Sequence, residues 1–245
     1  MPVQFPLNGG PIRTVSPLIG CLPLFAIGLL LCLLPVFLFD TARLALIRLG
    51  MTPTTAGLTI FGILFGSFIN LPVYWIRKDE LQPKNRFGPF GAALSQSYER
   101  VQQETLICIN VGGCVIPVMI ALFQAGRLLA DDFTPFLCAV LVSAVCVVVC
   151  WRAARPVEGI GILIPGFIPA AASVLATWMI LLPLGVDSSE RAATAFIAGV
   201  VGPIVGADLL HMKDLTRVPA AVVSIGGAGT YDGIVLSGIL AALLA

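Results

Sequence analysis

Charge is scarce in this sequence, and side chains suited to metal or disulfide chemistry are scarcer still. Only 11% of its 245 residues are charged, whereas about 25% is usual in soluble globular proteins. A single histidine excludes a histidine-rich zinc site, and no basic cluster of the kind that binds nucleic acid is present. None of the seven cysteines forms a CxxC pair, so we expect neither a disulfide framework nor a zinc site.

Long apolar runs fill most of the chain instead. Hydrophobic residues make up 58% of it, and the mean hydropathy is +1.01. We therefore predict an all-α, polytopic membrane helix bundle that forms one transmembrane domain over residues 1–245. Membrane lipid is the expected partner, and the sequence predicts no particular oligomeric state. The chain can hold about seven spans of ~20 residues. The expected spans are residues 17–39, 54–76, 105–125, 133–151, a fifth that ends near 185, 192–210 and 231–245.

Lysine and arginine predict the orientation in the membrane. With these spans, ten basic side chains fall on one side and four on the other. The positive-inside rule then places the N-terminus and the polar loop 77–104 in the cytoplasm. The first span is too long for a signal-peptide core and has no obvious cleavage site, so we expect it to remain as a span.

Two aspartates lie where aspartates are costly. Asp208 falls in the apolar run 192–210, and Asp232 opens the last apolar run. A carboxylate at the bilayer centre costs roughly 2.5–3.5 kcal/mol, so it is kept where it is paired, hydrated or used. We take both as candidate catalytic or ion-binding residues. They could share a proton, or each could pair separately with a basic residue such as Arg155, Lys213 or Arg217.

Other polar residues fall at the same predicted depth as the two aspartates. They are Glu158, Asn70 and Asn110, and each comes from a separate segment near the cytoplasmic side. Polar residues without a shared role would be distributed over both leaflets. The sequence therefore predicts a polar cavity in the cytoplasmic half, although the asparagines could equally satisfy backbone groups between helices.

Two stretches rich in glycine and proline interrupt the apolar pattern, at 155–169 and 220–229. Interrupted backbone at membrane depth survives where it is buried in protein or faces water, and paired broken segments are typical of a transporter's binding site. Glycines that simply allow close helix packing are the alternative. We expect residues 158–168 and 222–230 to contain non-helical backbone inside the membrane. The candidate ligand-binding residues here are Gly226, Gly227, Gly229 and Tyr231.

Asp208, His211 and Asp214 follow one another at three-residue spacing. On a continuous helix the first two would be neighbours, and a carboxylate with a histidine can bind a metal. A histidine near a helix end is more often an interfacial residue, and we expect no metal and no cofactor.

Three sequence blocks carry a resemblance to a known family. They are residues 109–117 (INVGGCVIP), 202–210 (GPIVGADLL) and 224–233 (SIGGAGTYDG). From about residue 55 to its end the chain resembles small bacterial and archaeal membrane proteins classed as a domain of unknown function. The resemblance implies a multi-pass protein of the cytoplasmic membrane and no particular activity.

A second resemblance concerns the two aspartates. Tyr231-Asp232 and Gly206-Ala-Asp208 are similar to the Tyr-Asp and Gly-x-Gly-Asp motifs of intramembrane aspartyl proteases. Here the order is reversed, and Val205 stands where the second motif has its first glycine. This similarity implies that both aspartates would be catalytic.

Three functions fit the sequence, and whether the protein is an enzyme stays open. The first is a small transporter or ion-coupled permease, in which Asp208 and Asp232 bind a proton or cation. The second is an intramembrane aspartyl-type hydrolase that uses the same two residues. The third is a non-catalytic membrane scaffold or assembly factor, in which the acids only pair with arginines.

Overall fold

The computed structural model describes most of the chain: residues 17–87, 93–157, 161–215, 222–229 and 232–245. By its internal contacts the chain divides into two units, Met1–Asp40 and Thr41–Ala245. Helix α1 (Pro17–Arg48) begins in the first unit and ends in the second. All other described elements belong to the second unit, and the candidate site lies there.

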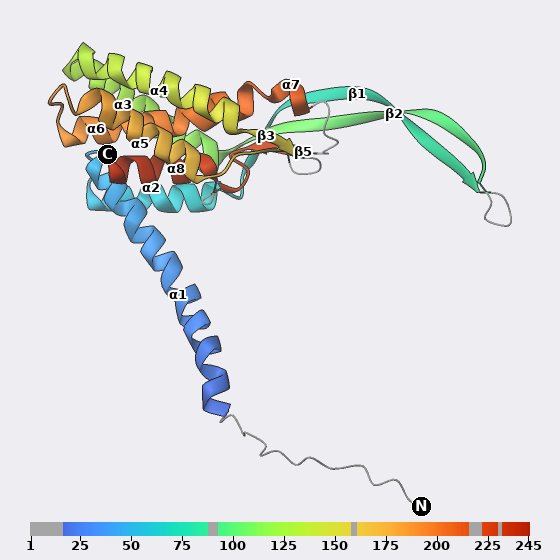
Figure 1. Ribbon diagram of the computed structural model, residues 1–245, viewed down its shortest axis with the longest axis horizontal. Helices are drawn as coiled ribbons and strands as arrows, with labels where there is room; N and C mark the ends of the chain where they lie inside the picture. Colours follow the sequence, from blue (N-terminus) through green and yellow to red (C-terminus); the bar gives the residue numbers. More distant parts are fainter. Residues whose placement is uncertain (1–16, 88–92, 158–160, 216–221, 230–231) are drawn as a thin grey trace, which may run out of the picture. The chain divides into compact units, whose positions relative to one another are not determined.

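The described residues are mainly helical, as predicted. Four helical segments among them are long and apolar enough to cross a membrane: Phe25–Arg48, Val111–Asp131, Phe133–Ala153 and Ser188–Leu209. Three shorter apolar helices accompany them: α2 (Pro53–Gly66), α5 (Phe167–Leu181) and α8 (Gly233–Leu244). In the second unit the helices lie side by side, and the strands leave the bundle at one end (Figure 1).

Helix α6 (Ser188–Val201) is the centre of the bundle and continues directly into the π-helix η2 (Gly202–Leu209). Every residue of α6 from 192 to 200 is buried. It packs against α3 (Ile116–Asp131), α4 (Phe133–Ala153), α5 and α8. Small residues allow these close approaches, since Gly199 lies against the backbone of Ser237 and Gly202 against the Cys146 side chain.

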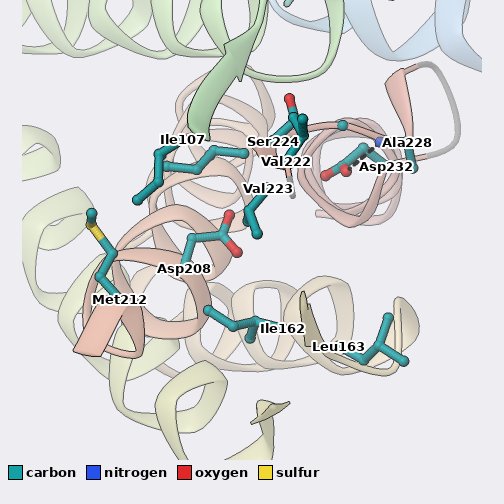
Figure 2. Close-up of a pocket in the computed structure, with 12 residues that line it drawn as sticks. Ile107, Ile162, Leu163, Asp208, Met212, Val222, Val223, Ser224, Ala228 and Asp232 are labelled. Carbon is teal, nitrogen blue, oxygen red and sulfur yellow. Dashed lines mark hydrogen bonds between the residues drawn. The ribbon is translucent and has the colours of Figure 1, made fainter. Parts of the chain in front are cut away.

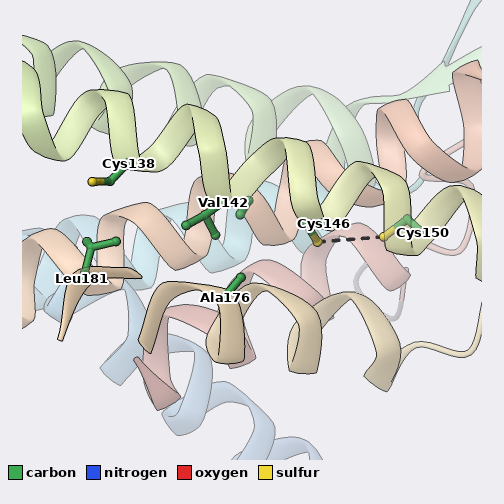
Figure 3. Packing of buried hydrophobic residues seen from close by; sticks show 7 residues of the cluster. Cys138, Val142, Cys146, Cys150, Ala176 and Leu181 are labelled. Carbon is green, nitrogen blue, oxygen red and sulfur yellow. Dashed lines mark hydrogen bonds between the residues drawn. The ribbon is translucent and has the colours of Figure 1, made fainter. Parts of the chain in front are cut away.

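The interface between α4 and α5 shows how the buried cysteines are used. The thiols of Cys146 and Cys150 lie 4.0 Å apart, one helical turn from each other (Figure 3). Cys138 and Val142 continue the same face of α4 toward Leu181 at the end of α5. These cysteines are free and serve as small core residues. The outer faces of the helices carry large exposed apolar side chains, as lipid contact requires.

A β-hairpin is the main departure from the predicted all-α fold. Strand β1 (Asn70–Phe87) pairs antiparallel with β2 (Ala93–Asn110), in a register that joins Asn70 to Asn110. The expected spans 54–76 and 105–125 are therefore wrong at 70–76 and 105–110, and the expected loop 77–104 lies within the hairpin. Pro72 disfavours helix at this point, and the residues after it, Val-Tyr-Trp-Ile, have high β-propensity.

Both glycine- and proline-rich stretches contain non-helical backbone, as expected. Strand β5 (Val222–Ile225) pairs parallel with residues 106–109 of β2. Strands β3 (Arg155–Val157) and β4 (Gly161–Leu163) form a second, short hairpin before α5. Helix α5 begins at Phe167, and residues 158–160 and 230 of the two predicted stretches lie outside the described residues. A short helix, α7 (Met212–Leu215), follows η2.

The end of the bundle away from the strands is held by side chains that bind backbone carbonyls. The Leu49 carbonyl, between α1 and α2, accepts bonds from Arg127 Nη1 at 2.9 Å and Gln124 Nε2 at 2.8 Å. Arg191 Nη1 donates to the Val186 carbonyl at 2.6 Å, and Arg48 donates to the Leu243 carbonyl in α8. We call this region the capped end, because arginines satisfy carbonyls that the helix termini leave free.

Candidate functional site: an acid-lined cavity at the strand end of the bundle

A cavity of about 280 Å³ lies where the strands meet the helix ends. Four separate segments line it: β2, β4, the η2–α7 region, and the stretch from β5 to the start of α8. Its walls are mostly apolar, and the polar side chains among the described lining residues are Asp208, Asp232 and Ser224 (Figure 2). The apolar walls include Ile107, Ile162, Leu163, Met212, Val222 and Val223. We call this region the cavity end.

Asp208 is presented to the cavity by the π-helix η2. Pro203, near the start of η2, has no backbone N–H and cannot donate the usual helical hydrogen bond. In η2 the hydrogen bonds join residues five apart, as in the bond from Leu210 N to Val205 O at 3.0 Å. π-Helical turns inside α-helices are frequent at functional sites. The Asp208 side chain is half-buried and forms no hydrogen bond or ion pair with any residue that the structure describes. Its carboxylate is therefore available to an occupant of the cavity.

Asp232 is fixed in place by the backbone. It is the N-cap of α8, where its Oδ1 accepts from Ile234 N at 2.9 Å and its Oδ2 from Ala228 N at 3.3 Å. Asp232 thus has a structural role as well as a place in the cavity wall.

The two carboxylates belong to one site. They turn toward the same space from opposite sides, with Val223 of β5 drawn between them (Figure 2). Separate ion pairs were the alternative, and within the described part of the chain neither acid pairs with an arginine or lysine. Arg155 is exposed, and Arg217 lies outside the described residues.

Asn70 and Asn110 tie the strands together and do not line the cavity. The fully buried Asn110 donates from Nδ2 to Ser67 O at 2.8 Å and to Asn70 Oδ1 at 3.0 Å, and its Oδ1 accepts from Gly113 N at 2.7 Å. Ser224 Oγ donates to Asn70 Oδ1 at 2.7 Å. The network joins α2, the hairpin and β5, so the asparagines hold the cavity wall that Ser224 belongs to.

The comparisons with known proteins give a family and no activity. The family described as "Protein of unknown function (DUF1614)" matches residues 64–244. The chain belongs to this family. No curated protein and no solved structure matches it. The matched region of this DUF1614 protein includes both aspartates, both asparagines and the whole cavity.

Of the three candidate glycines, only Gly227 lines the cavity. Gly226 and Gly229 have φ values of 72° and 62°, which side chains rarely adopt. Gly226 also lies against the backbone of Gly113, and Gly229 against Ser67. These two glycines let the turn after β5 pass close to the end of α2 at Ser67 and to the start of the helical segment Val111–Asp131 at Gly113. Glu158 and Tyr231, the other candidates, lie outside the described residues.

The His211 side chain contacts backbone carbonyls of η2. Its Nδ1 lies 3.1 Å from Gly206 O and 3.0 Å from Ala207 O, and both are hydrogen-bonding distances. These carbonyls are near the end of the π-helix, where backbone acceptors are left free. Within the described residues, no group of three potential metal ligands occurs.

Sequence reasoning missed Ser224 and the apolar lining of the cavity. Ser224 is the one hydroxyl in the run from Ala220 to Gly227, and that isolation was a usable signal. Met212 and Ile162 offered none, because apolar residues are everywhere in this chain. Gln124, fully buried at the capped end, was also missed. A glutamine inside an apolar span usually has a backbone partner, and here it is Leu49 O.

Proposed function

We propose that this protein is a small ion-coupled permease and that the acid-lined cavity is its substrate and ion site. The observation that carries the proposal is that Asp208 and Asp232, from different segments, line one cavity. Acids inside membrane proteins typically face the bundle interior or water and mark ion pathways. In this proposal Asp208 binds and releases a proton or cation while Asp232 supplies a fixed negative charge.

The lengths of the helices support a transporter. Helices α2, α5 and α8 have 14, 15 and 12 residues. At 1.5 Å per residue they are about 18–23 Å long, which is less than the ~30 Å hydrocarbon core. Each is continued at the cavity end by strand or turn. Helices that stop inside the membrane beside a binding site are a recurring feature of transporters. We accordingly propose seven spans, of which these three are completed by extended backbone.

The arginines at the capped end support the proposed orientation. Four basic residues fall on the predicted side away from the cytoplasm. Three of them, Arg48, Arg127 and Arg191, bind backbone carbonyls. These three arginines thus have a structural role and need not be read as topology signals. Setting them aside strengthens the bias of basic residues toward the other side of the membrane. We propose a cytoplasmic N-terminus and a cavity in the cytoplasmic half of the membrane.

An aspartyl-type hydrolase is the second candidate, because two carboxyl groups on one cavity can also share a proton and activate water. The capping bonds to Asp232 argue against it. Both oxygens of that carboxylate accept backbone N–H groups and hold it in place, whereas a hydrolase acid must be free to donate a proton in each cycle. A hydrolase would cleave membrane substrates and show no ion flux.

Flux measurements on reconstituted vesicles test the proposal. Vesicles containing the protein and an internal pH dye receive an inward gradient of sodium, potassium or a small organic cation, one at a time. At least one gradient should drive a protein-dependent change in internal pH. Asp208→Asn and Asp232→Asn should each abolish it, because asparagine preserves size and cannot carry the charge.

Asp132→Asn is the matched control. Asp132 caps α4 at the capped end, and its Oδ1 accepts from Thr134 N at 3.1 Å, much as Asp232 accepts from Ile234. This variant should retain wild-type flux. Flux that survives in both cavity variants would contradict the proposal. Cleavage of membrane peptides without flux, lost in the same two variants, would replace it with the hydrolase.

A further inference from the structure

The cavity carries charge of only one sign among its described lining residues. Asp208 and Asp232 are both acidic, and no arginine, lysine or histidine is among the lining residues that the structure describes. An anionic occupant would meet two negative groups without a compensating positive one. The charge of the site therefore favours a cation.

The walls of the cavity restrict the kind of cation. Hard metal ions such as Ca²⁺ and Mg²⁺ are held by six or more oxygens. A dehydrated ion needs protein oxygens in place of most of its hydration shell. Here the side-chain oxygens come from Asp208, Asp232 and Ser224, and the rest of the lining is largely Ile, Leu, Met and Val. A volume of about 280 Å³ is much larger than one dehydrated metal ion and is near the lower end of small-molecule pockets.

We infer that the occupant is a small organic cation with an apolar body, such as an alkyl- or arylammonium ion. This rests on the proposed function, because it names the substrate class of the same cavity. The ammonium group lies beside the carboxylates, and the apolar body contacts Ile107, Ile162 and Val223. Apolar pockets with a few placed polar groups bind ligands in this manner: the walls supply affinity and the polar groups supply orientation.

The two acids have different parts in this binding. Asp232 is held by two backbone N–H groups, whereas Asp208 has no hydrogen-bonding partner among the described residues. Asp208 is thus the direct counter-ion of the ammonium group. Asp232 strengthens the negative field without having to leave its capping position. Substitution at Asp208 should consequently weaken binding more than substitution at Asp232.

Calorimetric titration of the full chain in detergent tests this with three probes that share an aromatic body. Benzyltrimethylammonium is a permanent cation, benzyl alcohol is neutral and benzenesulfonate is an anion. The cation should bind most tightly and the anion least. Asp208→Asn should weaken cation binding about tenfold or more, the usual effect of losing one charged partner. Asp208→Glu should restore most of it, and Asp132→Asn should have no effect.

Equal or tighter binding of benzenesulfonate would overturn the inference, as would cation binding that is unchanged in Asp208→Asn. Unfolding temperatures of the variants show whether a loss of binding reflects misfolding. Restored binding in Asp208→Glu would show independently that the lost carboxylate, and not misfolding, caused the loss in Asp208→Asn. The outcomes also separate this inference from the proposed function. Sodium- or potassium-driven flux without binding of the organic cation would overturn the inference alone. Cation binding at Asp208 without any flux would overturn the permease and leave the binding site standing.

Discussion

The two ends of the helix bundle carry polar residues for opposite reasons. At the capped end Arg127 and Gln124 both donate to the carbonyl of Leu49, and Arg191 donates to that of Val186. At the cavity end Asp208 faces open space, with no hydrogen bond to any described residue. Charged and amide side chains in an apolar chain are costly, and they are typically kept where they satisfy another group or serve a ligand. The comparison separates residues that maintain the bundle from a residue kept for binding.

Asp232 and Asn110 stand between these two classes. Both lie at the cavity end, and both satisfy backbone groups: Asp232 caps α8, and Asn110 binds Ser67 O and Gly113 N. Structural and binding roles can therefore meet in one region and, in Asp232, in one residue. Substitutions that change stability and activity separately can distinguish them.

The largest effect should come from Gly226→Ala. Gly226 has a φ of 72° and lies against the backbone of Gly113 and Cys114, so a methyl group adds both backbone strain and overlap. We expect a loss of about 2–5 kcal/mol of unfolding free energy, measured by denaturation in detergent. Gly185→Ala is the control, with a φ of 67° and no neighbour within 4 Å of the added carbon. Its loss should be limited to strain, about 1–2 kcal/mol. Equal losses would show that close packing at Gly226 is unimportant.

Asn110→Ala should follow, with a loss of about 2–4 kcal/mol, because it removes three hydrogen bonds, to Ser67 O, Asn70 Oδ1 and Gly113 N, although Asn70 Oδ1 keeps its bond from Ser224 Oγ. The same denaturation assay measures it. Ser143→Ala provides the contrast. The buried Ser143 hydroxyl forms no hydrogen bond with any residue that the structure describes, so its removal should be neutral or slightly stabilising. A neutral Asn110→Ala would mean that the network does not support the cavity wall.

Arg127→Met should cost about 1 kcal/mol, since Leu49 O keeps its bond from Gln124 Nε2. The capped end is remote from the cavity, and flux per folded molecule should remain that of the wild type. A variant that folds normally but transports poorly would break the division between the two ends.

The smallest stability changes belong to the acids. Asp208→Asn removes no described hydrogen bond and should shift unfolding free energy by less than about 0.5 kcal/mol. Asp232→Asn keeps the cap at Ile234 N but has no second oxygen for Ala228 N, so it should cost about 0.5 kcal/mol. Asp232→Ala should instead cost about 1 kcal/mol through loss of the cap. Thermal denaturation in detergent distinguishes these cases. A large loss in Asp208→Asn would point to a structural partner outside the described residues.

Several features could be predicted from the sequence because they depend on the conformational preferences of residues within one segment. The run 133–151 was predicted as a span and corresponds to α4 (Phe133–Ala153), since its residues are continuously apolar, it has no Gly, and its one Pro, Pro135, lies in the first turn where helices tolerate it. The non-helical backbone near Gly226 and Gly229 followed from the density of glycine there. The shared position of Asp208 and Asp232 followed from counting spans, because both fall at the same end of consecutive helices.

Other features depend on contacts between distant segments. Residues 70–76 are apolar enough for a span, and only their pairing with residues 105–110 makes them a strand. The π-helix that presents Asp208 depends on packing of Gly202 and Gly206 against α4, which no local pattern reveals. The role of Asn110 likewise required Ser67 and Asn70 to be brought together across the fold.

The central claim is that position 208 faces a hydrated, negatively charged cavity, and thiol labelling of Asp208→Cys tests it most directly. In sealed vesicles of known orientation, cationic and anionic methanethiosulfonate reagents are applied to one side at a time, with the wild-type chain and its buried cysteines as background. The account predicts labelling from the side that bears the 77–104 hairpin, and faster reaction with the cationic reagent because Asp232 remains. No labelling above the wild-type background, or equal rates for the two reagents, would contradict it.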